Sequence, residues 1–230
     1  MPRTFCWAVA GFLLLAGPAW AAVDGAKCTV MTATAEPPKE LAEPIRALLS
    51  DRSVQLLDGE GKLIGEFWFR KELRVKATAE ELKKGIGYRK LEESTVLGAV
   101  RLDQAWTSFR KQIIKPGLYT LRIGFQPMDG DHMGTAPYNE FCLLSPAAAD
   151  KSPALLEGKQ LHELSAKTLP GTTHPVVMLL FPNAKTEDAP KLLDKQNGIW
   201  VLSWKEDVAS AGQKGVLGLG LTLFGVTTAE

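Results

Sequence analysis

Residues 118–126 carry the pattern that most constrains how this chain can fold. Apolar and polar residues alternate along the segment, with the apolar ones at Tyr119, Leu121, Ile123 and Phe125. Successive side chains of a β-strand point to opposite faces of its sheet, so the alternation predicts a strand with one buried and one solvated face. Strands of that kind are typical of antiparallel sheets. We therefore expect the chain to contain an antiparallel sheet.

Further strand candidates are rich in the β-branched and aromatic residues that favour strands. They are residues 53–57, 62–69, 95–102, 106–114, 140–144, 176–181, 199–204 and 216–226. The turn residues of 58–61, Asp-Gly-Glu-Gly, predict a hairpin between the first two of these segments. Pro116-Gly117 predicts a second hairpin that joins 106–114 to 118–126.

Helical signals are few and short. Residues 39–49 have helical spacing of apolar residues, but Pro44 must start or kink any helix there. Thr78 and Glu81 have the spacing of a capping box before a short helix that Gly85 would end. Residues 155–166 form a third candidate. Roughly nine strands with one to three short helices predict an all-β fold, an antiparallel β-sandwich or a jelly-roll-like arrangement.

The first 21 residues have the three regions of a secretory signal peptide. Arg3 supplies a positive start, residues 5–16 are apolar, and Ala19-Trp20-Ala21 has the small-x-small pattern of a cleavage site. The apolar run is shorter than the roughly 20 residues that span a bilayer as a helix. We expect cleavage after Ala21, a single β-sandwich domain in residues 22–230, and a periplasmic or secreted location.

The charge balance of the chain limits which classes of partner are expected. The chain has 27 lysine and arginine residues and 26 aspartate and glutamate residues. Removal of the leader would take away Arg3 alone, which leaves equal numbers of basic and acidic residues. Nucleic acids and anionic membranes select basic surfaces, so neither is an expected partner. The most apolar later segment, 216–226, is too short to span a membrane as a helix, so we expect no integral membrane segment after cleavage.

Two cysteines, Cys28 and Cys142, remain after the leader. Export would place them in an oxidising compartment, where a disulfide between them is the simplest expectation. The alternative is two buried free thiols, because a sequence does not show whether two sulfur atoms meet.

The last two strand candidates suggest a specific packing. Residues 216–224 place leucines on one face and Gly218 and Gly220 on the other. We expect this strand to pair with 199–204 through a loop at 205–214, with Trp200 or Trp204 covering the glycines. The alternative is that Trp200 and Trp204 form an exposed stacking platform for a glycan or another small-molecule ligand.

The segment that follows 118–126 holds the one constellation that suggests chemistry. Asp129 and Asp131 could bind a hard cation such as Ca²⁺. Met128, His132 and Met133 offer soft sulfurs and an imidazole, which suit copper or, with His162 and His174, copper or zinc. A third interpretation is a tight turn in which the two aspartates bind backbone amides. A metal ion is therefore a possible cofactor, and the sequence alone leaves the three open.

The sequence around these residues resembles a block found in uncharacterised exported bacterial proteins. The shared pattern is Gly-x-Tyr-x-Leu-Arg from Gly117, then Gln-Pro-x-Asp-Gly-Asp-His from Gln126 with Gly134 after it, and Phe-Cys-Leu-Leu from Phe141. It covers less than a fifth of the chain. The resemblance implies a shared architecture and export, and it carries over no catalytic or binding residue.

Common catalytic motifs do not occur in the sequence. It lacks a Gly-x-Ser-x-Gly elbow, a His-Glu-x-x-His motif and a Cys-x-x-Cys motif. We therefore expect an exported, non-enzymatic β-sandwich that binds a protein or small-molecule ligand through loops at one end of its sheets. The alternative is a metal-binding protein that uses the Asp129–His132 loop, and a hydrolase of unfamiliar type ranks third.

Overall fold

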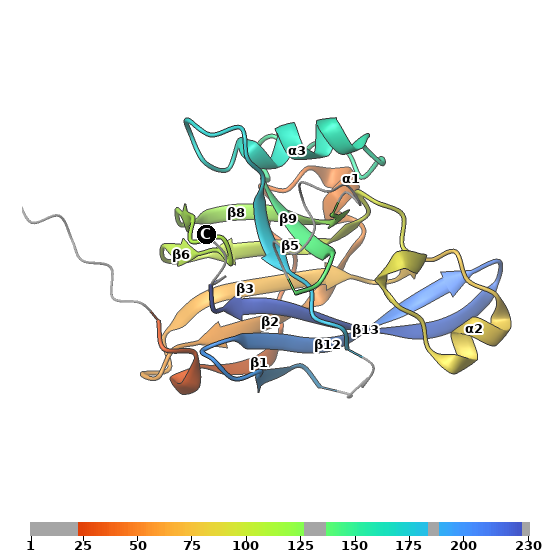
Figure 1. The fold of residues 1–230 in the computed structure, drawn as a ribbon, viewed down its shortest axis with the longest axis horizontal. Helices are drawn as coiled ribbons and strands as arrows, with labels where there is room; N and C mark the ends of the chain where they lie inside the picture. The colour runs from red at the N-terminus through yellow and green to blue at the C-terminus, as the bar shows by residue number, and fades with distance from the viewer. Residues whose placement is uncertain (1–22, 127–136, 184–188, 227–230) are drawn as a thin grey trace, which may run out of the picture.

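The chain folds into two layers of mainly antiparallel strands with three short α-helices at the periphery (Figure 1). A computed structural model describes residues 23–126, 137–183 and 189–226. The predicted all-β, sandwich-like fold is confirmed. Short strands dominate because most apolar segments of the chain are bounded by turn residues within about ten positions.

The larger layer is a seven-stranded sheet in the order β1-β2-β3-β5-β8-β9-β10. All its neighbours are antiparallel, so the chain runs through the sheet as a meander. The strands are β1 (Thr29–Thr34), β2 (Leu49–Leu57), β3 (Leu63–Arg70), β5 (Val96–Leu102), β8 (Gly117–Phe125), β9 (Glu140–Pro146) and β10 (Val176–Leu179). The hairpin predicted at the Asp-Gly-Glu-Gly turn joins β2 to β3 and is confirmed.

The smaller layer has four strands. A long hairpin pairs β12 (Trp200–Ser210) with β13 (Gln213–Phe224). On the other side of β12 lie β11 (Lys191–Asp194), which is antiparallel to it, and β4 (Leu73–Arg74), which is parallel. We expected a loop at 205–214, but both strands continue through it to a turn at Ala211 and Gly212, which have positive φ angles. The longer β12 keeps a strand's alternation in this region, because Glu206 and Val208 are buried and Asp207 between them is exposed.

The core lies between the two sheets and is one continuous cluster. Leucines at 217, 219, 221 and 223 of β13 face it, as the alternation predicted, and all four are buried. From the larger sheet it receives Phe67 and Phe69 of β3 together with Leu121 of β8. Phe69 stacks on Trp204 of β12, with ring centroids 3.9 Å apart. Aromatic stacking of this kind joins the two layers near their middle.

Two of the three short helices carry a local sequence signal at one or both ends. Helix α1 covers only Glu43–Arg46 and has Pro44 in its first turn, where a proline is well tolerated. Helix α2 (Ala79–Lys84) has the predicted capping box of Thr78 and Glu81 and ends at Gly85, whose φ is 92°. Helix α3 (Gly158–Ala166) lies over the outer face of β9 (Figure 1). The described residues also form two 3-10 turns, η1 (Gly25–Lys27) and η2 (Tyr88–Lys90).

The segment before β8 corrects one prediction. Residues 106–114 do not pair with β8. They form their own small hairpin of β6 (Trp106–Thr107) and β7 (Ile113–Ile114), and β8 pairs with β5 and β9 instead. Positive φ at Lys111 shows that the chain turns back inside this segment, which local composition did not reveal.

The outer face of β8 corrects a second prediction. We expected it to be solvated, but Thr120 and Arg122 are fully buried there. The segment 147–157 crosses this face and brings Asp150 onto Arg122. Residues 147–157 therefore cover the outer face of β8. The alternation along β8 separates an apolar face, which is turned to the core, from a polar face that is buried as well.

The expected disulfide is not formed in this structure, where Cys28 and Cys142 are both buried free thiols. Cys28 precedes β1 at one edge of the large sheet, and Cys142 lies in β9, with four strands between them. Neighbouring strands are about 4.8 Å apart, whereas a disulfide needs Cα atoms within about 7 Å. Burial raises the pKa of Cys28 to about 11 and raises that of Cys142 as well. Both thiols therefore stay protonated near neutral pH.

Candidate functional site

Strand β1 is an edge of the large sheet with an accessible surface along its whole length. It pairs with β2 on one side only, and none of its residues is buried. Met31 is 49% exposed, while Val30 packs partly against the core. Strand β11 lies near β1, but no backbone hydrogen bond joins the two among the residues described. The outer side of β1 is therefore open.

The backbone groups of Val30, Thr32 and Thr34 point away from β2. The Ala35 N–H donates to the carbonyl of Asp51 at 2.8 Å, which fixes the phase of the antiparallel pairing. Bonded pairs alternate along such a ladder, so every second residue of β1 turns its N–H and C=O outward. Within the described ranges, these outward groups have no hydrogen-bond partner. They form a row of donors and acceptors at the pairing distance of a further strand.

The composition of β1 leaves this edge unprotected. Its sequence, Thr-Val-Met-Thr-Ala-Thr, contains no charge, proline or glycine. Proteins commonly protect an edge strand with charged residues, proline, bulges or a covering segment, because a bare edge pairs with other chains. The nearby edge strand β11 has such protection, since it begins at Lys191 and ends at Asp194. The two edges thus differ in their capacity to accept another strand.

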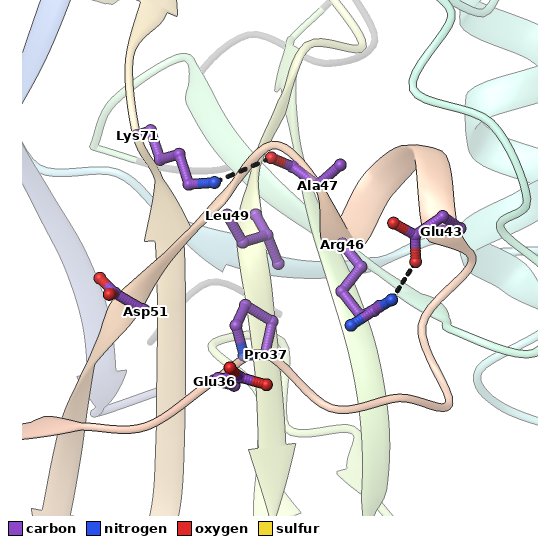
Figure 2. Close-up of a pocket in the computed structure, with 8 residues that line it drawn as sticks. All are labelled: Glu36, Pro37, Glu43, Arg46, Ala47, Leu49, Asp51 and Lys71. Atoms are coloured by element: carbon purple, nitrogen blue, oxygen red, sulfur yellow. Dashed lines mark hydrogen bonds and ion pairs between the residues drawn. The ribbon is translucent and has the colours of Figure 1, made fainter.

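A groove of about 300 Å³ opens where β1 ends. Figure 2 shows Glu36 and Pro37, from the segment after β1, on one side of it, and Arg46 of α1 on the other. Leu49 of β2 contributes an apolar surface between them. A strand that paired along β1 would continue toward this groove, because the groove follows β1 in the direction of the chain.

The charges around the groove are only partly neutralised. Arg46 binds the carboxylate of Glu43, and Lys71 donates to the carbonyl of Ala47 at 3.1 Å (Figure 2). Glu36 and Asp51 also line it, and neither forms an ion pair with any residue that the structure describes. The groove therefore offers two exposed carboxylates to a basic group from outside.

A second polar cluster, around Arg122, is closed to ligands. Its guanidinium forms a two-point ion pair with Asp150, at 2.8 and 2.9 Å. The other donors reach the carbonyl and hydroxyl of Ser94 and the carbonyls of Ser152 and Ala154. A guanidinium has five N–H donors, and all are used here. The cluster fixes the segment 147–157 to the sheet and leaves no donor for a substrate.

Glu206 is a buried acid that faces the core from β12. It accepts a hydrogen bond from the Trp204 ring N–H at 2.8 Å. Burial raises the pKa of Glu206 to about 8, although the Trp204 hydrogen bond and the charge of Arg52 both act to lower it. The carboxyl is therefore mainly protonated at neutral pH. It does not line the groove at the end of β1, and we expect it to act on stability.

The predicted metal ligands Met128, Asp129, Asp131, His132 and Met133 lie outside the described residues. The two remaining histidines do not gather other ligands. His162 lies on α3 and His174 is exposed after it, and no group of three His, Cys, Asp or Glu side chains that could hold a metal ion occurs in the described part of the chain. Metal binding by the Asp129–His132 loop stays a prediction.

The positions of Trp200 and Trp204 differ from the expected packing over the glycines and from an exposed stacking platform. Trp204 is only 4% exposed and stacks on Phe69, so it belongs to the core and cannot stack on a glycan. Trp200 is half-buried against Gly25, where an added Cβ would lie 2.5 Å from its ring. Neither covers the glycines of β13. A Cβ at Gly218 would instead meet the carbonyl oxygen of Asn183 at 2.2 Å, so the backbone after β10 covers this strip.

Sequence reasoning missed the β1 edge because the place of a strand in its sheet is not a local property. Residues 29–34 show no apolar alternation, and whether a strand lies at an edge depends on the order of strands in the sheet. One signal was present, namely six consecutive residues with no charge, proline or glycine. Glu36 and Asp51 gave no signal, since they are 15 positions apart and meet only because β1 pairs with β2.

No family model, curated protein or solved structure matches this chain. Among the described residues, no helix has the length and apolar character needed to cross a membrane.

Proposed function

We propose that the protein is an exported binding module that captures an extended segment of a partner along β1. The observation that carries this proposal is the row of outward backbone groups at Val30, Thr32 and Thr34, which lack partners in the described structure. Addition of a strand to such an edge is a common mode of peptide recognition, in which backbone hydrogen bonds supply affinity. The leader at residues 1–21 supports export, and equal acidic and basic content after cleavage argues against nucleic acid or an anionic membrane as the partner.

This mode of binding makes a specific demand on the partner. Its segment must be extended and uncharged where it faces β1, because β1 has no charged side chain to pair with an ion. Beyond Thr34, the exposed carboxylates of Glu36 and Asp51 favour a basic residue on the partner. The preferred ligand is thus a short β-forming stretch with a lysine or arginine at one end.

The test is a selection of random peptides on the folded chain 22–230. Thr32→Pro removes an outward N–H, so it should abolish binding of the selected peptides. Thr32→Val is the matched control, because it keeps the N–H and the strand preference and changes only the side-chain oxygen. Peptides that bind the Thr32→Pro variant as well as the unchanged protein would show that β1 is not the docking site.

Metal binding is the second candidate function, and the observation in its favour is the donor set of residues 128–133. Elemental analysis of the purified mature chain should then show stoichiometric Cu, Zn or Ca, and His132→Ala should lower it. Metal content that this substitution leaves unchanged would remove the candidate.

A further inference from the structure

We infer that the segment that docks on β1 is β1 of a second copy of this chain, so that the protein forms a twofold dimer through a continuous sheet. This inference rests on the proposed function and names its partner. Two copies of one strand can pair antiparallel about a twofold axis, which presents the same surface from both sides. Here the axis would pass beside Thr32.

The register of this pairing follows from the outward groups. With Thr32 opposite Thr32 of the second copy, Val30 lies opposite Thr34 of the second copy. Every outward N–H and C=O of one copy then faces an outward group of the other, as a bonded antiparallel pair requires. Between these pairs, Met31 lies opposite Ala33 of the second copy, a large apolar side chain beside a small one. No like charges meet along the strand, because it has none.

The ends of the paired strands carry complementary charges. The twofold axis brings the η1 turn that precedes β1, which holds Lys27, to the end of the second copy's β1, where Glu36 and Pro37 line the groove. Lys27 is exposed, and its ion pair with Asp24 is long, at 3.8 Å. Glu36 and Asp51 have no ion pair within the described ranges. The twofold axis produces this contact twice, and each contact places a cation at an exposed carboxylate.

Lys27 and Glu36 of one chain cannot satisfy each other. Lys27 precedes β1 and Glu36 follows it, so the six residues of the strand, about 20 Å of extended chain, lie between them. A favourable interaction between these two side chains must therefore join two molecules. The contact area of a six-residue strand is well below the roughly 1,000 Å² of a stable interface, so the dimer should form only at high protein concentration.

The experiment is sedimentation of the mature chain over a concentration range from about 1 µM to about 1 mM, which brackets weak association. The unchanged protein and Thr32→Val should both show a monomer–dimer equilibrium, and Thr32→Pro should stay monomeric. Lys27→Glu and Glu36→Lys should each weaken dimerisation about tenfold, since each replaces two attractive contacts by repulsive ones. A 1:1 mixture of these two variants should dimerise like the unchanged protein, because each chain then supplies the charge that the other lacks.

Two results would overturn the inference. One is an unchanged protein that remains monomeric at the highest concentration, and the other is a dimer that Thr32→Pro and both charge variants leave intact. Neither result by itself removes the proposed function. If the peptide selection still yields ligands that fail on Thr32→Pro, β1 captures a segment of another protein. If that selection also fails, the proposed function falls together with the dimer.

Discussion

At one edge of the large sheet, β10 buries all four of its residues, and the chain after it continues onto β13 of the other layer. The Phe181 N–H donates to the Gly220 carbonyl at 2.8 Å, and Tyr88 joins the Phe181 carbonyl to the Gly220 N–H. At the opposite edge, β1 buries none of its residues and leaves its outward groups unpaired within the described structure. The same sheet thus closes on the second layer at β10 and stays open at β1.

This difference separates an edge whose backbone groups contribute to stability from an edge whose backbone groups remain available for binding. A buried backbone group without a partner destabilises a protein by about 1–3 kcal/mol, so an edge inside the molecule has to be paired. An edge in water has no such requirement, because water molecules form hydrogen bonds with its N–H and C=O groups. An open edge without charge or proline therefore costs the folded state little and remains available for another strand. Substitutions should be severe near the closed edge and mild at the open one.

The largest effect is expected at Asp150, in the segment that covers the outer face of β8. Asp150→Ala leaves Arg122 buried without a counter-ion, so the free energy of unfolding should fall by roughly 3–5 kcal/mol. Urea denaturation followed by tryptophan fluorescence measures it. The double variant Arg122→Met with Asp150→Leu is the control, since removal of both charges should restore much of the loss. A loss below about 1 kcal/mol for Asp150→Ala would show that the pair does not fix segment 147–157.

The next effect is a dependence on pH from Glu206, which lies within electrostatic reach of Arg52 in β2, the neighbour of the open edge. Below about pH 4 the carboxyl is protonated in both folded and unfolded chains. Above that it ionises only when unfolded, because its pKa in the folded chain is about 8. The free energy of unfolding should therefore fall as the pH rises toward 8 and level off beyond it, by about 1.4 kcal/mol for each pKa unit of difference.

Glu206→Gln provides the control for this pH dependence. The amide cannot ionise and can still accept the hydrogen bond from Trp204, so the decline between pH 5 and 8 should disappear. Chemical denaturation at a series of pH values would measure both proteins. An equal decline in the variant would assign the pH dependence to other groups.

A smaller loss of stability is expected when the Tyr88 hydroxyl, which links the two layers at the closed edge, is removed. Tyr88→Phe removes the group that donates to the Phe181 carbonyl and accepts from the Gly220 N–H. The free energy of unfolding should fall by about 1–3 kcal/mol, and the amide of Gly220 should exchange faster with solvent. Tyr138→Phe is the matched control, because Tyr138 contacts Phe181 by its ring, and the ring is retained. Equal losses in the two variants would argue against the hydroxyl link.

The smallest effect on stability is expected at the open edge itself. Thr32→Pro removes an N–H that points away from β2, so the free energy of unfolding, measured by thermal denaturation, should change by less than about 1 kcal/mol. Ala33→Pro, one residue along, removes an N–H that points toward Ser53 of β2 and should destabilise the protein strongly. If both prolines were equally damaging, β1 would not have one free side, and the contrast between the two edges would be lost.

Local pattern was enough to predict most strands, because side-chain alternation and turn residues act over a few positions. The β2–β3 hairpin, the leucine face of β13 and the capping box of α2 all followed from spacing alone. Predictions failed where a distant segment decided the outcome. The outer face of β8 looked solvated until residues 147–157 covered it, and the glycines of β13 looked suited to a tryptophan until the chain after β10 occupied them.

The candidate site was beyond the sequence for the same reason. Periodicity indicates which residues of a strand share a face, but it carries no information on which strand lacks a neighbour. The sequence by itself determined that this chain forms antiparallel sheets around a leucine-rich core, since each strand encodes its own alternation. Only the tertiary structure decided that β10 is closed and β1 is open, because an edge is defined by the strands that are absent beside it.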